Sequence, residues 1–464
     1  MTEDRFLLKN ATLFDASGLR KLDIRLDRGV VAEIGIGLSP SVSEEIVECE
    51  GHLVAPSFID LHTHLREPGG EEAETFLSGS IAAAAGGYSR VVAMPNTEPV
   101  PDSIGVIDEI RGRTLRLPIT IDLAASITKG RSGQEVVEIS ELTRRGVKFF
   151  TDDGNGVQSA MVMRRAFEAS AVSGAILAQH CEEESIMASG AMNEGELGER
   201  LGLKMISPLA ETVMVARDIE LCKAIGGRLH LQHISTSRAV ELAVEAKGGG
   251  AAISCEVTPH HLLLDESYVG SGNSLFKVNP PLRTVGDIDG LWRGIGSGAV
   301  DVIGTDHAPH PRWKKDLPFE NAAFGMVGIE ESLSVSFLGA VRFMERNKGY
   351  LPKADVVTRS IEQLCLPDLS IEEFNWLIKI VDLLSIGPRR LLRLPYEPLA
   401  IGSKVDLVII DPSVRRKVST ETIWSKSKNS PYLGMELPLA IRHNIVNGRM
   451  IVRNRSVEVE RYWR

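Results

Sequence analysis

Short apolar runs, many of them rich in β-branched residues, recur between residues 53 and 305. Apolar character within each run is nearly continuous, which is typical of parallel strands covered on both faces. The eight runs span residues 53–61, 89–95, 117–124, 146–150, 174–179, 228–233, 251–257 and 299–305. We therefore expect eight parallel strands in this part of the chain.

Segments with helical spacing of apolar residues lie between most of these runs. Residues 73–87, 159–174 and 208–227 show this spacing most clearly, and each segment ends in glycine, a common helix stop. Eight strands alternating with helices predict an α/β fold, a (β/α)8 barrel of the TIM type. A doubly wound open sheet is the alternative, but it would not be expected to draw ligands from so many separate strand ends.

The two ends of the chain have a different pattern, with short strands expected in residues 5–50, 404–412 and 443–454. Neither end is long enough to bury a robust core alone. The sequence thus predicts a small β-domain formed from both termini, with the catalytic barrel inserted between its two parts. The predicted bounds are 1–54 and 395–464 for the β-domain and 55–394 for the barrel.

Residues 345–380 lie beyond the eighth run, are charged, and are interrupted by Gly349, Pro352 and Pro367. We interpret them as an extra helical excursion to which no role is assigned.

Composition narrows the class of partner. The formal net charge is −10 and the isoelectric point is about 5.7, which argues against nucleic acid or an anionic membrane as the main partner. No run of about 18 apolar residues predicts a membrane span, and the N-terminus lacks a signal-peptide core. The five cysteines are scattered and form no CxxC pair, which favours buried thiols in a reducing cytoplasm.

Histidines and one aspartate follow the predicted strands at positions that a barrel would bring to one mouth. His62 and His64 flank Thr63 at the end of the first run. Side chains two apart on a strand share a face, so both imidazoles could reach a single metal ion. Arg66 follows closely, and arginine is suited to clamping a carboxylate in two-point geometry.

His180 and His233 end the fifth and sixth runs, and Asp306 closes the eighth. An aspartate at this position could bind metal and exchange a proton with the attacking water or the leaving group, although aspartate also serves as a helix N-cap. His310, in the same TDHAPH segment, is a candidate substrate contact, whereas His307 is expected at most to shape the loop.

Three other histidines are assigned structural roles. His230 precedes the strand end by three residues and should face differently from His233, while His52 and His443 lie in the predicted β-domain. A site with two metal ions also needs a bridging anion. The fourth run offers a carboxylate in residues 151–154 (TDDG), or Lys148 if its amine carried a carboxylate derived from CO₂.

Several motifs of this chain, in this order, resemble those of dihydroorotases of the amidohydrolase superfamily, most closely the bacterial type I enzymes. The matching segments cover nearly the whole chain and lie at 58–69 (FIDLHTHLREPG), 93–97 (AMPNT), 151–154 (TDDG), 178–183 (AQHCEE), 277–283 (KVNPPLR), 305–310 (TDHAPH) and 427–432 (SKNSPY).

The resemblance implies a zinc site at the barrel mouth, commonly with two ions per chain. His62, His64 and Asp306 would hold the more buried ion, and His180 and His233 the second.

The resemblance also implies a bridge and a substrate site. Asp153 would bridge the two ions, and we favour it over a carboxylated Lys148 because a carboxylate needs no modification. The substrate carboxylate and ring would contact four further residues: Arg66, Asn96, His310 and Asn279.

The implied reaction is the reversible cyclisation of N-carbamoyl-L-aspartate to L-dihydroorotate and water, a step of de novo pyrimidine (UMP) biosynthesis. In the hydrolytic direction a zinc-bound hydroxide would attack the ring amide, while Asp306 moves the proton to the departing nitrogen. We expect a cytoplasmic homodimer that acts on a small molecule and can form a complex with aspartate transcarbamoylase.

Two alternatives stay open at this point. A hydantoinase or allantoinase would share the barrel and the histidines, and Lys148 favours it, whereas Arg66, Asn96 and Asn279 argue against it. A non-catalytic subunit that scaffolds aspartate transcarbamoylase would tolerate loss of metal ligands, but every proposed ligand is present.

Overall fold

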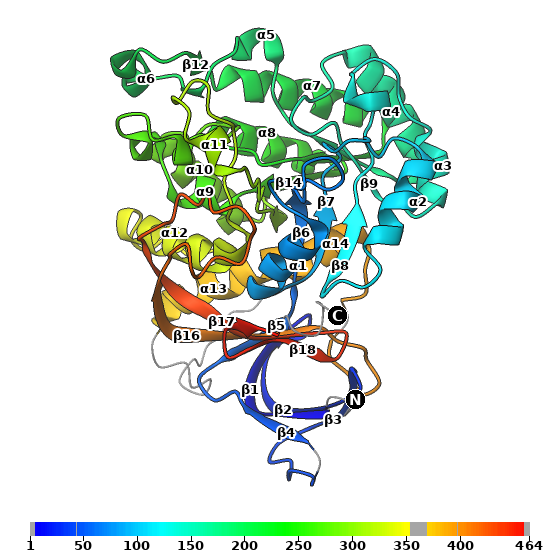
Figure 1. Ribbon diagram of the computed structural model, residues 1–464, viewed down its shortest axis with the longest axis vertical. Coiled ribbons are helices and arrows are strands. Elements are labelled where there is room, and N and C mark those ends of the chain that lie inside the picture. Colours follow the sequence, from blue (N-terminus) through cyan, green and yellow to red (C-terminus); the bar gives the residue numbers. More distant parts are fainter. Residues whose placement is uncertain (1–4, 43, 353–368, 397, 459–464) are drawn as a thin grey trace.

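The computed structural model describes residues 5–42, 44–352, 369–396 and 398–458. Two bodies are visible in Figure 1, a larger one of strands and surrounding helices and a smaller one of strands from both terminal parts of the described chain.

The larger body is a closed barrel of eight parallel strands. Hydrogen bonding divides it into a three-stranded and a five-stranded sheet. Parallel bridges between Ala125 and Phe150 and between Thr63 and His307 join the two sheets on both sides, which closes the barrel. The strands are β6 (Phe58–Thr63), β7 (Tyr88–Ala93), β8 (Thr120–Leu123), β9 (Phe149–Phe150), β10 (Ile176–Gln179), β13 (Arg228–Leu231), β14 (Ile253–Val257) and β15 (Val302–Ile303). The prediction of a (β/α)8 barrel is confirmed.

The first apolar run is two strands rather than one. β5 (Leu53–Pro56) belongs to the smaller body, and β6 begins two residues later. Ser57 separates them, and its backbone N–H donates to Asp406 O at 3.0 Å. The continuous apolar pattern concealed this change of sheet, because both strands are buried on both faces.

Helices surround the barrel as expected from their spacing. The three clearest predictions correspond to α1 (Phe76–Ala85), α4 (Ala160–Ser173) and α7 (Leu209–Ile225). Other helices of at least six residues are α2 (Ile104–Arg113), α3 (Ile139–Arg144), α6 (Glu196–Leu201), α8 (Ser237–Gly248), α10 (Val285–Ser297), α12 (Ser332–Arg346), α13 (Ile371–Leu384) and α14 (Ile386–Leu392). Short elements in the loops are α5 (Glu184–Met187), α9 (Pro259–Leu263), α11 (Arg312–Lys315), β11 (Met192–Asn193) and β12 (Met205–Ile206).

Strands from both termini form one nine-stranded sheet. Its order is β19-β18-β17-β16-β5-β1-β2-β3, with β4 paired to β1. The two ends meet at β5, which is parallel to β1 and antiparallel to β16. The bounds are β1 (Arg5–Asp15), β2 (Gly18–Asp27), β3 (Val30–Gly35), β4 (Glu45–Glu48), β16 (Leu407–Lys417), β17 (Glu436–Val446), β18 (Arg449–Arg453) and β19 (Ser456–Val457).

The barrel interior is filled with apolar side chains towards the amino ends of its strands. A cluster that includes Ile59, Val92, Phe149 and Val302 packs there with Leu392 of α14. Such packing leaves polar side chains at the opposite, carboxyl ends, which is where barrels of this type carry their active sites.

The proposed excursion at 345–380 is described only in part, because residues 353–368 lie outside the described chain. Its described part includes residues 371–380 of α13, in which Phe374 and Trp376 are fully buried. Trp376 meets Trp292 of α10 edge-on, with ring centroids 5.2 Å apart, so this part of the segment packs on the barrel helices. Within the described chain, no helix combines the length and apolar character that a membrane crossing requires.

Candidate metal centre

Six of the predicted residues converge at the carboxyl end of the barrel. His62 lies in β6 and His64 just after it, while the other four follow their strands directly or within three residues. All six are buried: His62, His64, Asp153, His180, His233 and Asp306.

Two groups of ligand atoms share one carboxylate. His62, His64 and Asp153 form one group and Asp153, His180 and His233 form the other, with the ligand atoms of each group all within 4.8 Å of one another. Asp153 therefore occupies the position that a bridging ligand needs, within reach of both groups.

The first group is tightly arranged and adjoins Asp306. Asp153 Oδ1 lies 3.2 Å from His62 Nε2, and Asp153 Oδ2 lies 3.3 Å from His64 Nε2. Asp306 Oδ1 lies 3.0 Å from His64 Nε2 and 3.6 Å from His62 Nε2. Imidazole nitrogens and carboxylate oxygens facing one point are the donor set that zinc and similar divalent ions take.

In the second group, His180 Nδ1 lies 2.8 Å from His233 Nε2. Asp153 Oδ1 is 3.7 Å from each of these nitrogens. Two basic nitrogens and a carboxylate oxygen that face one another in a buried space fit a shared cation better than they fit mutual hydrogen bonding.

One orphaned atom supports this fit. His62 Nε2 is buried and forms no hydrogen bond within the described part of the chain, while His62 Nδ1 lies 2.8 Å from Glu256 Oε1. A carboxylate behind one ring nitrogen fixes the tautomer and leaves the other nitrogen free to bind metal. Two of the six residues, His233 and Asp306, also have positive φ angles of 31° and 45°, a strained backbone that is common at functional sites.

The electrostatics keep both carboxylates ionised. Burial alone would raise the pKa of the Asp153 carboxyl, but the neighbouring His62, His233 and His64 rings hold it well below its ordinary value. Burial likewise opposes a low pKa at Asp306, and the hydrogen bond with His64 and the charge of His62 outweigh it. Anionic carboxylates are the form that binds metal.

Glu256 is a component of the centre that the sequence analysis missed. Its Oε1 atom accepts from His62 Nδ1 and from the backbone N–H of His233, and its Oε2 atom lies 3.3 Å from His230 Nε2. The His62 ring lowers the pKa of the fully buried Glu256 to about 2 despite its burial. A lone acidic residue inside the apolar run 251–257 was the signal that could have revealed it.

The three histidines assigned structural roles lie outside both ligand groups. His230 supports Glu256 from behind, and its Nδ1 atom lies 2.8 Å from Ser254 Oγ. His52 and His443 lie in the smaller body, near Asp411 and on β17 respectively.

Lys148 does not reach the centre. It precedes β9 at the amino end of the barrel, and its Nζ atom donates to Leu392 O at 2.8 Å. The alternative of a carboxylated Lys148 as the bridge is therefore wrong, because the strand places it at the end opposite the histidines. For the same reason, Lys148 no longer favours the hydantoinase alternative.

A cavity of about 180 Å³ opens beside the two groups, and all four predicted substrate contacts line it. They are Arg66, Asn96, Asn279 and His310. The two candidate metal-ligating groups and these four side chains thus share a space of small-molecule size.

The cavity presents one fixed positive charge. Arg66 Nε donates to Pro309 O at 3.1 Å, and Arg66 Nη2 lies 3.2 Å from His310 Nε2. Burial lowers the pKa of Arg66 to about 10, so its guanidinium remains charged at neutral pH. Burial, together with the charge of Arg66, lowers the pKa of His310 to about 3, which keeps that imidazole neutral.

The two asparagines have different surroundings. Asn96 Oδ1 accepts from His64 Nδ1 at 2.9 Å, so Asn96 orients a proposed ligand while it lines the cavity. Asn279 Nδ2 donates to Glu182 Oε2 at 3.0 Å, but Asn279 Oδ1 is buried without a partner in the described chain. An unused acceptor at this point suits an N–H group of a bound ring.

Comparison with known proteins is consistent with this geometry. The sequence model of the family described as Dihydro-orotase-like matches residues 51–239. A dihydroorotase of Pelotomaculum thermopropionicum is 36% identical over 456 residues, covering 98% of this chain and 100% of that protein. A dihydroorotase of Staphylococcus epidermidis is 37% identical over 431 residues, covering 92% of this chain and 94% of that protein.

Among solved structures, an L-hydantoinase (dihydropyrimidinase) of Arthrobacter aurescens has a similar fold, with a TM-score of 0.81 and 24% identity. The alignment covers 98% of this chain and 97% of that one. A D-hydantoinase aligns with a TM-score of 0.78 and 22% identity, over 98% and 96% of the two chains. At this level of identity the likeness concerns the fold alone.

Proposed function

This chain belongs to the dihydroorotase family, and from that membership we propose that it catalyses the reversible cyclisation of N-carbamoyl-L-aspartate to L-dihydroorotate and water, within pyrimidine synthesis. It is a metal-dependent cyclic amidohydrolase. The observation that carries the specific reaction is the charged Arg66 guanidinium in the same small cavity as the two metal-ligating groups.

Arg66 explains the choice of substrate. Dihydroorotate keeps a free carboxylate beside its cyclic amide, and a guanidinium with Asn96 and His310 around it can bind that group. A cyclic amide without a carboxylate would leave the buried guanidinium unpaired, at a cost of a few kcal/mol. Asn279 Oδ1 is placed to accept from a ring N–H.

We propose zinc as the metal, with two ions per chain, and Asp153 would bind both of them as the bridging ligand. When bound, zinc polarises the amide carbonyl and lowers the pKa of water towards neutrality. The two ions would be held by His62, His64 and Asp306 and by His180 and His233.

Asp306 has the proton-transfer role. Its carboxylate is ionised and faces the cavity, so it can accept the proton of the attacking water. The same oxygen then delivers that proton to the departing ring nitrogen. Glu256 holds the His62 ring throughout.

A turnover assay tests the function. The zinc-loaded enzyme should hydrolyse dihydroorotate and leave hydantoin and allantoin essentially unchanged. Replacing His62 or Asp306 by alanine should abolish turnover while the circular dichroism spectrum keeps its native form. Near-native rates in either variant, or a preference for hydantoin, would overturn the assignment.

The bridge has its own test. Asp153→Ala should lose metal measured by elemental analysis, whereas Lys148→Ala should retain it, because Lys148 contacts Leu392 at the other end of the barrel. Loss of metal only in the Lys148 variant would contradict the proposed bridge.

Further proposals concern the oligomeric state, the partners, the cellular compartment and the domain division. We propose a cytoplasmic homodimer that acts without nucleic acid and can associate with aspartate transcarbamoylase. Free buried thiols at Cys49, Cys181, Cys222 and Cys255 support a reducing compartment, and Cys365 lies outside the described residues.

The proposed domain division is a β-domain of residues 1–54 and 395–464 around a barrel of residues 55–394. The pairing of β5 with β1 and β16 supports the joining of the two ends.

A further inference from the structure

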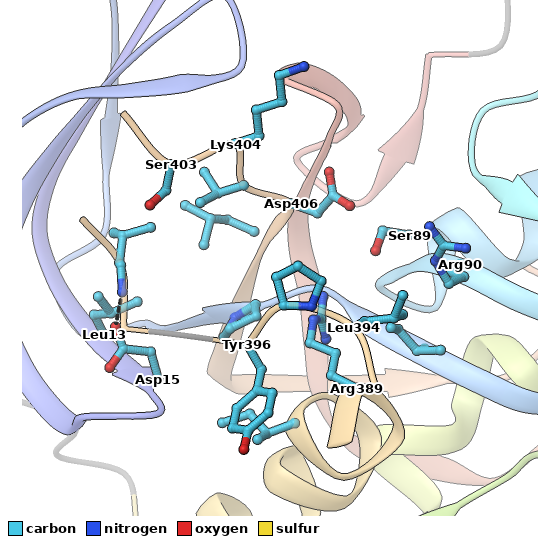
Figure 2. Close-up of a pocket in the computed structure, with 17 residues that line it drawn as sticks. Leu13, Asp15, Ser89, Arg90, Arg389, Leu394, Tyr396, Ser403, Lys404 and Asp406 are labelled. Carbon is cyan, nitrogen blue, oxygen red and sulfur yellow. Dashed lines mark hydrogen bonds between the residues drawn. The ribbon is translucent and has the colours of Figure 1, made fainter. Parts of the chain in front are cut away.

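A second cavity lies at the opposite end of the barrel from the metal centre, where the amino ends of β6 and β7 meet the terminal sheet (Figure 2). Its volume is about 460 Å³, against about 180 Å³ for the catalytic cavity. Ile59, Leu394, Leu399 and the Tyr396 ring contribute apolar walls. A cavity of this size with apolar walls is suited to a small organic ligand.

A buried guanidinium, that of Arg389, lines this cavity. Arg389 of α14 is only 9% exposed, and its Nη1 atom donates to Ser385 O at 2.8 Å and to Ser385 Oγ at 3.0 Å. Within residues 5–42, 44–352, 369–396 and 398–458, no carboxylate lies within salt-bridge distance of Arg389, and only its Nη1 atom donates a hydrogen bond. Burying a charged group in this way is costly unless an anion meets it.

Other donors surround the same space. Figure 2 shows Ser89, Arg90 and Asp406 around the cavity with Arg389, and the Lys404 side chain directed away from them. Ser89 is only 2% exposed and also lines the cavity. Arg90 adds a second guanidinium, which also pairs with Asp122 at 2.6 Å.

The two carboxylates that line the cavity, those of Asp15 and Asp406, accept hydrogen bonds from other groups rather than from these donors. Asp15 is already occupied, since it accepts from Ser17, from Arg20 and from the Leu399 backbone N–H. Asp406 accepts from the backbone N–H of Asn447 at 2.6 Å and is the one further carboxylate among the described lining residues.

Arg389 keeps unused donors after the other charges are paired. Arg90 pairs with Asp122 and Asp15 with Arg20, and Asp406, whose charge acts on Arg389, lies beyond salt-bridge distance from it. An anion that met Arg389 directly would gain charge-assisted hydrogen bonds that Asp406 does not make.

We propose that this cavity is a second ligand site, which binds a small organic anion consisting of a carboxylate or phosphate group on an apolar ring. Arg389 and Ser89 bind the anionic group, and Leu394 and Tyr396 pack against the ring. The site is separate from the catalytic cavity: Ile59 lines it at the amino end of β6, five residues before His64, or about 16 Å along an extended strand. The inference does not depend on the proposed reaction.

Isothermal titration calorimetry on the zinc-loaded full-length enzyme tests the site, with phenyl phosphate and benzoate as probes and benzyl alcohol as the neutral control. One or both anions should bind, and the preference between them identifies the anionic group. Arg389→Met should weaken that binding at least about tenfold, because it removes the charge-assisted hydrogen bonds. Absence of anion binding to the wild type at millimolar concentration would overturn the proposal, as would equal binding by a folded Arg389→Met variant.

Two further variants separate this site from the catalytic cavity and from effects on folding. Arg66→Met removes the catalytic guanidinium and should leave probe binding unchanged, whereas loss of binding in this variant would place the probe in the catalytic cavity and overturn the proposal. Ser403→Phe keeps Arg389 and fills the second cavity from its partly exposed edge. It should abolish probe binding with an unchanged melting temperature, and undiminished binding would contradict the proposal.

Discussion

At the scale of single residues, Glu256 connects the two candidate ligand groups. One of its oxygens accepts from the His62 ring and from the backbone of His233, so a single carboxylate orients one histidine of each group. Gly304 makes room for it, because a Cβ atom at that position would lie 2.4 Å from the Glu256 carboxyl. The glycine before Thr305 and Asp306 is thus explained by the side chain behind the metal site rather than by a turn.

Glu256→Gln should lower zinc affinity by about 10- to 100-fold, because a neutral amide orients His62 and increases its basicity less well than a carboxylate does. Competition with a chromogenic chelator measures the change. Asp218→Asn is the matched control, since Asp218 is equally buried but pairs with Arg217 instead of a proposed ligand. A similar loss of affinity in both variants would indicate a general effect of removing buried charge and contradict the specific role.

At the scale of elements, a C-terminal loop reaches back to the catalytic cavity. Asn429 is buried, and its Oδ1 atom accepts from the His310 backbone N–H at 3.1 Å. Its Nδ2 atom donates to Ala308 O and Gly325 O, both at 3.3 Å. One side chain therefore holds two segments of the cavity wall, although it belongs to a loop between β16 and β17 of the terminal sheet.

Asn429→Ala should raise the KM for dihydroorotate roughly five- to twentyfold with a smaller effect on kcat, because two hydrogen bonds to the His310 segment and one to Gly325 are lost while the proposed metal ligands stay in place. Steady-state kinetics and zinc content measure the two effects. Ser430→Ala is the control in the same loop, since the Ser430 hydroxyl accepts only from Tyr432 N in the described chain. Loss of zinc from the Asn429 variant would show that the loop supports the metal centre instead.

The sequence predicted elements better than it predicted contacts between them. Apolar runs followed by histidine or aspartate identified the barrel strands and the residues that converge at its mouth, because the periodicity of a strand and the parallel topology place such residues together. The break at Ser57 was hidden by uninterrupted apolar character on either side. Glu256 was missed, and Asn429 was noted only as part of the segment 427–432, because their roles depend on partners far away in the sequence, His62 and His310 respectively.

At the scale of the whole molecule, the cavity at the amino end of the barrel also could not be predicted from local sequence patterns. Its lining residues come from β1, β5, β6, β7, α14, the segment before β16 and the first residue of β16, and none forms a recognisable motif. Only the joining of both termini in one sheet, and the seating of that sheet beneath the barrel (Figure 1), brings them together.

The terminal sheet also makes stability depend on pH through His443, which is buried on β17. Burial, reinforced by the charges of Arg442 and Arg453, lowers the pKa of His443 in the folded protein to about 4, against 6.5 for an ordinary histidine. Between these values the unfolded chain binds a proton that the folded chain does not. Stability should therefore rise with pH from about 4 to about 6.5 and fall on acidification through this range.

His443→Gln should remove this contribution. We expect the loss of unfolding free energy between pH 7 and pH 5 to be smaller in the variant by about 1 kcal/mol, below the full linkage value because solvent screens Arg442 and Arg453. Urea unfolding of both zinc-loaded proteins at the two pH values measures it. Because the metal centre is the same in both proteins, acid release of zinc cancels in the comparison. An equal pH dependence in the two proteins would show that His443 becomes protonated in the folded sheet as readily as in the unfolded chain.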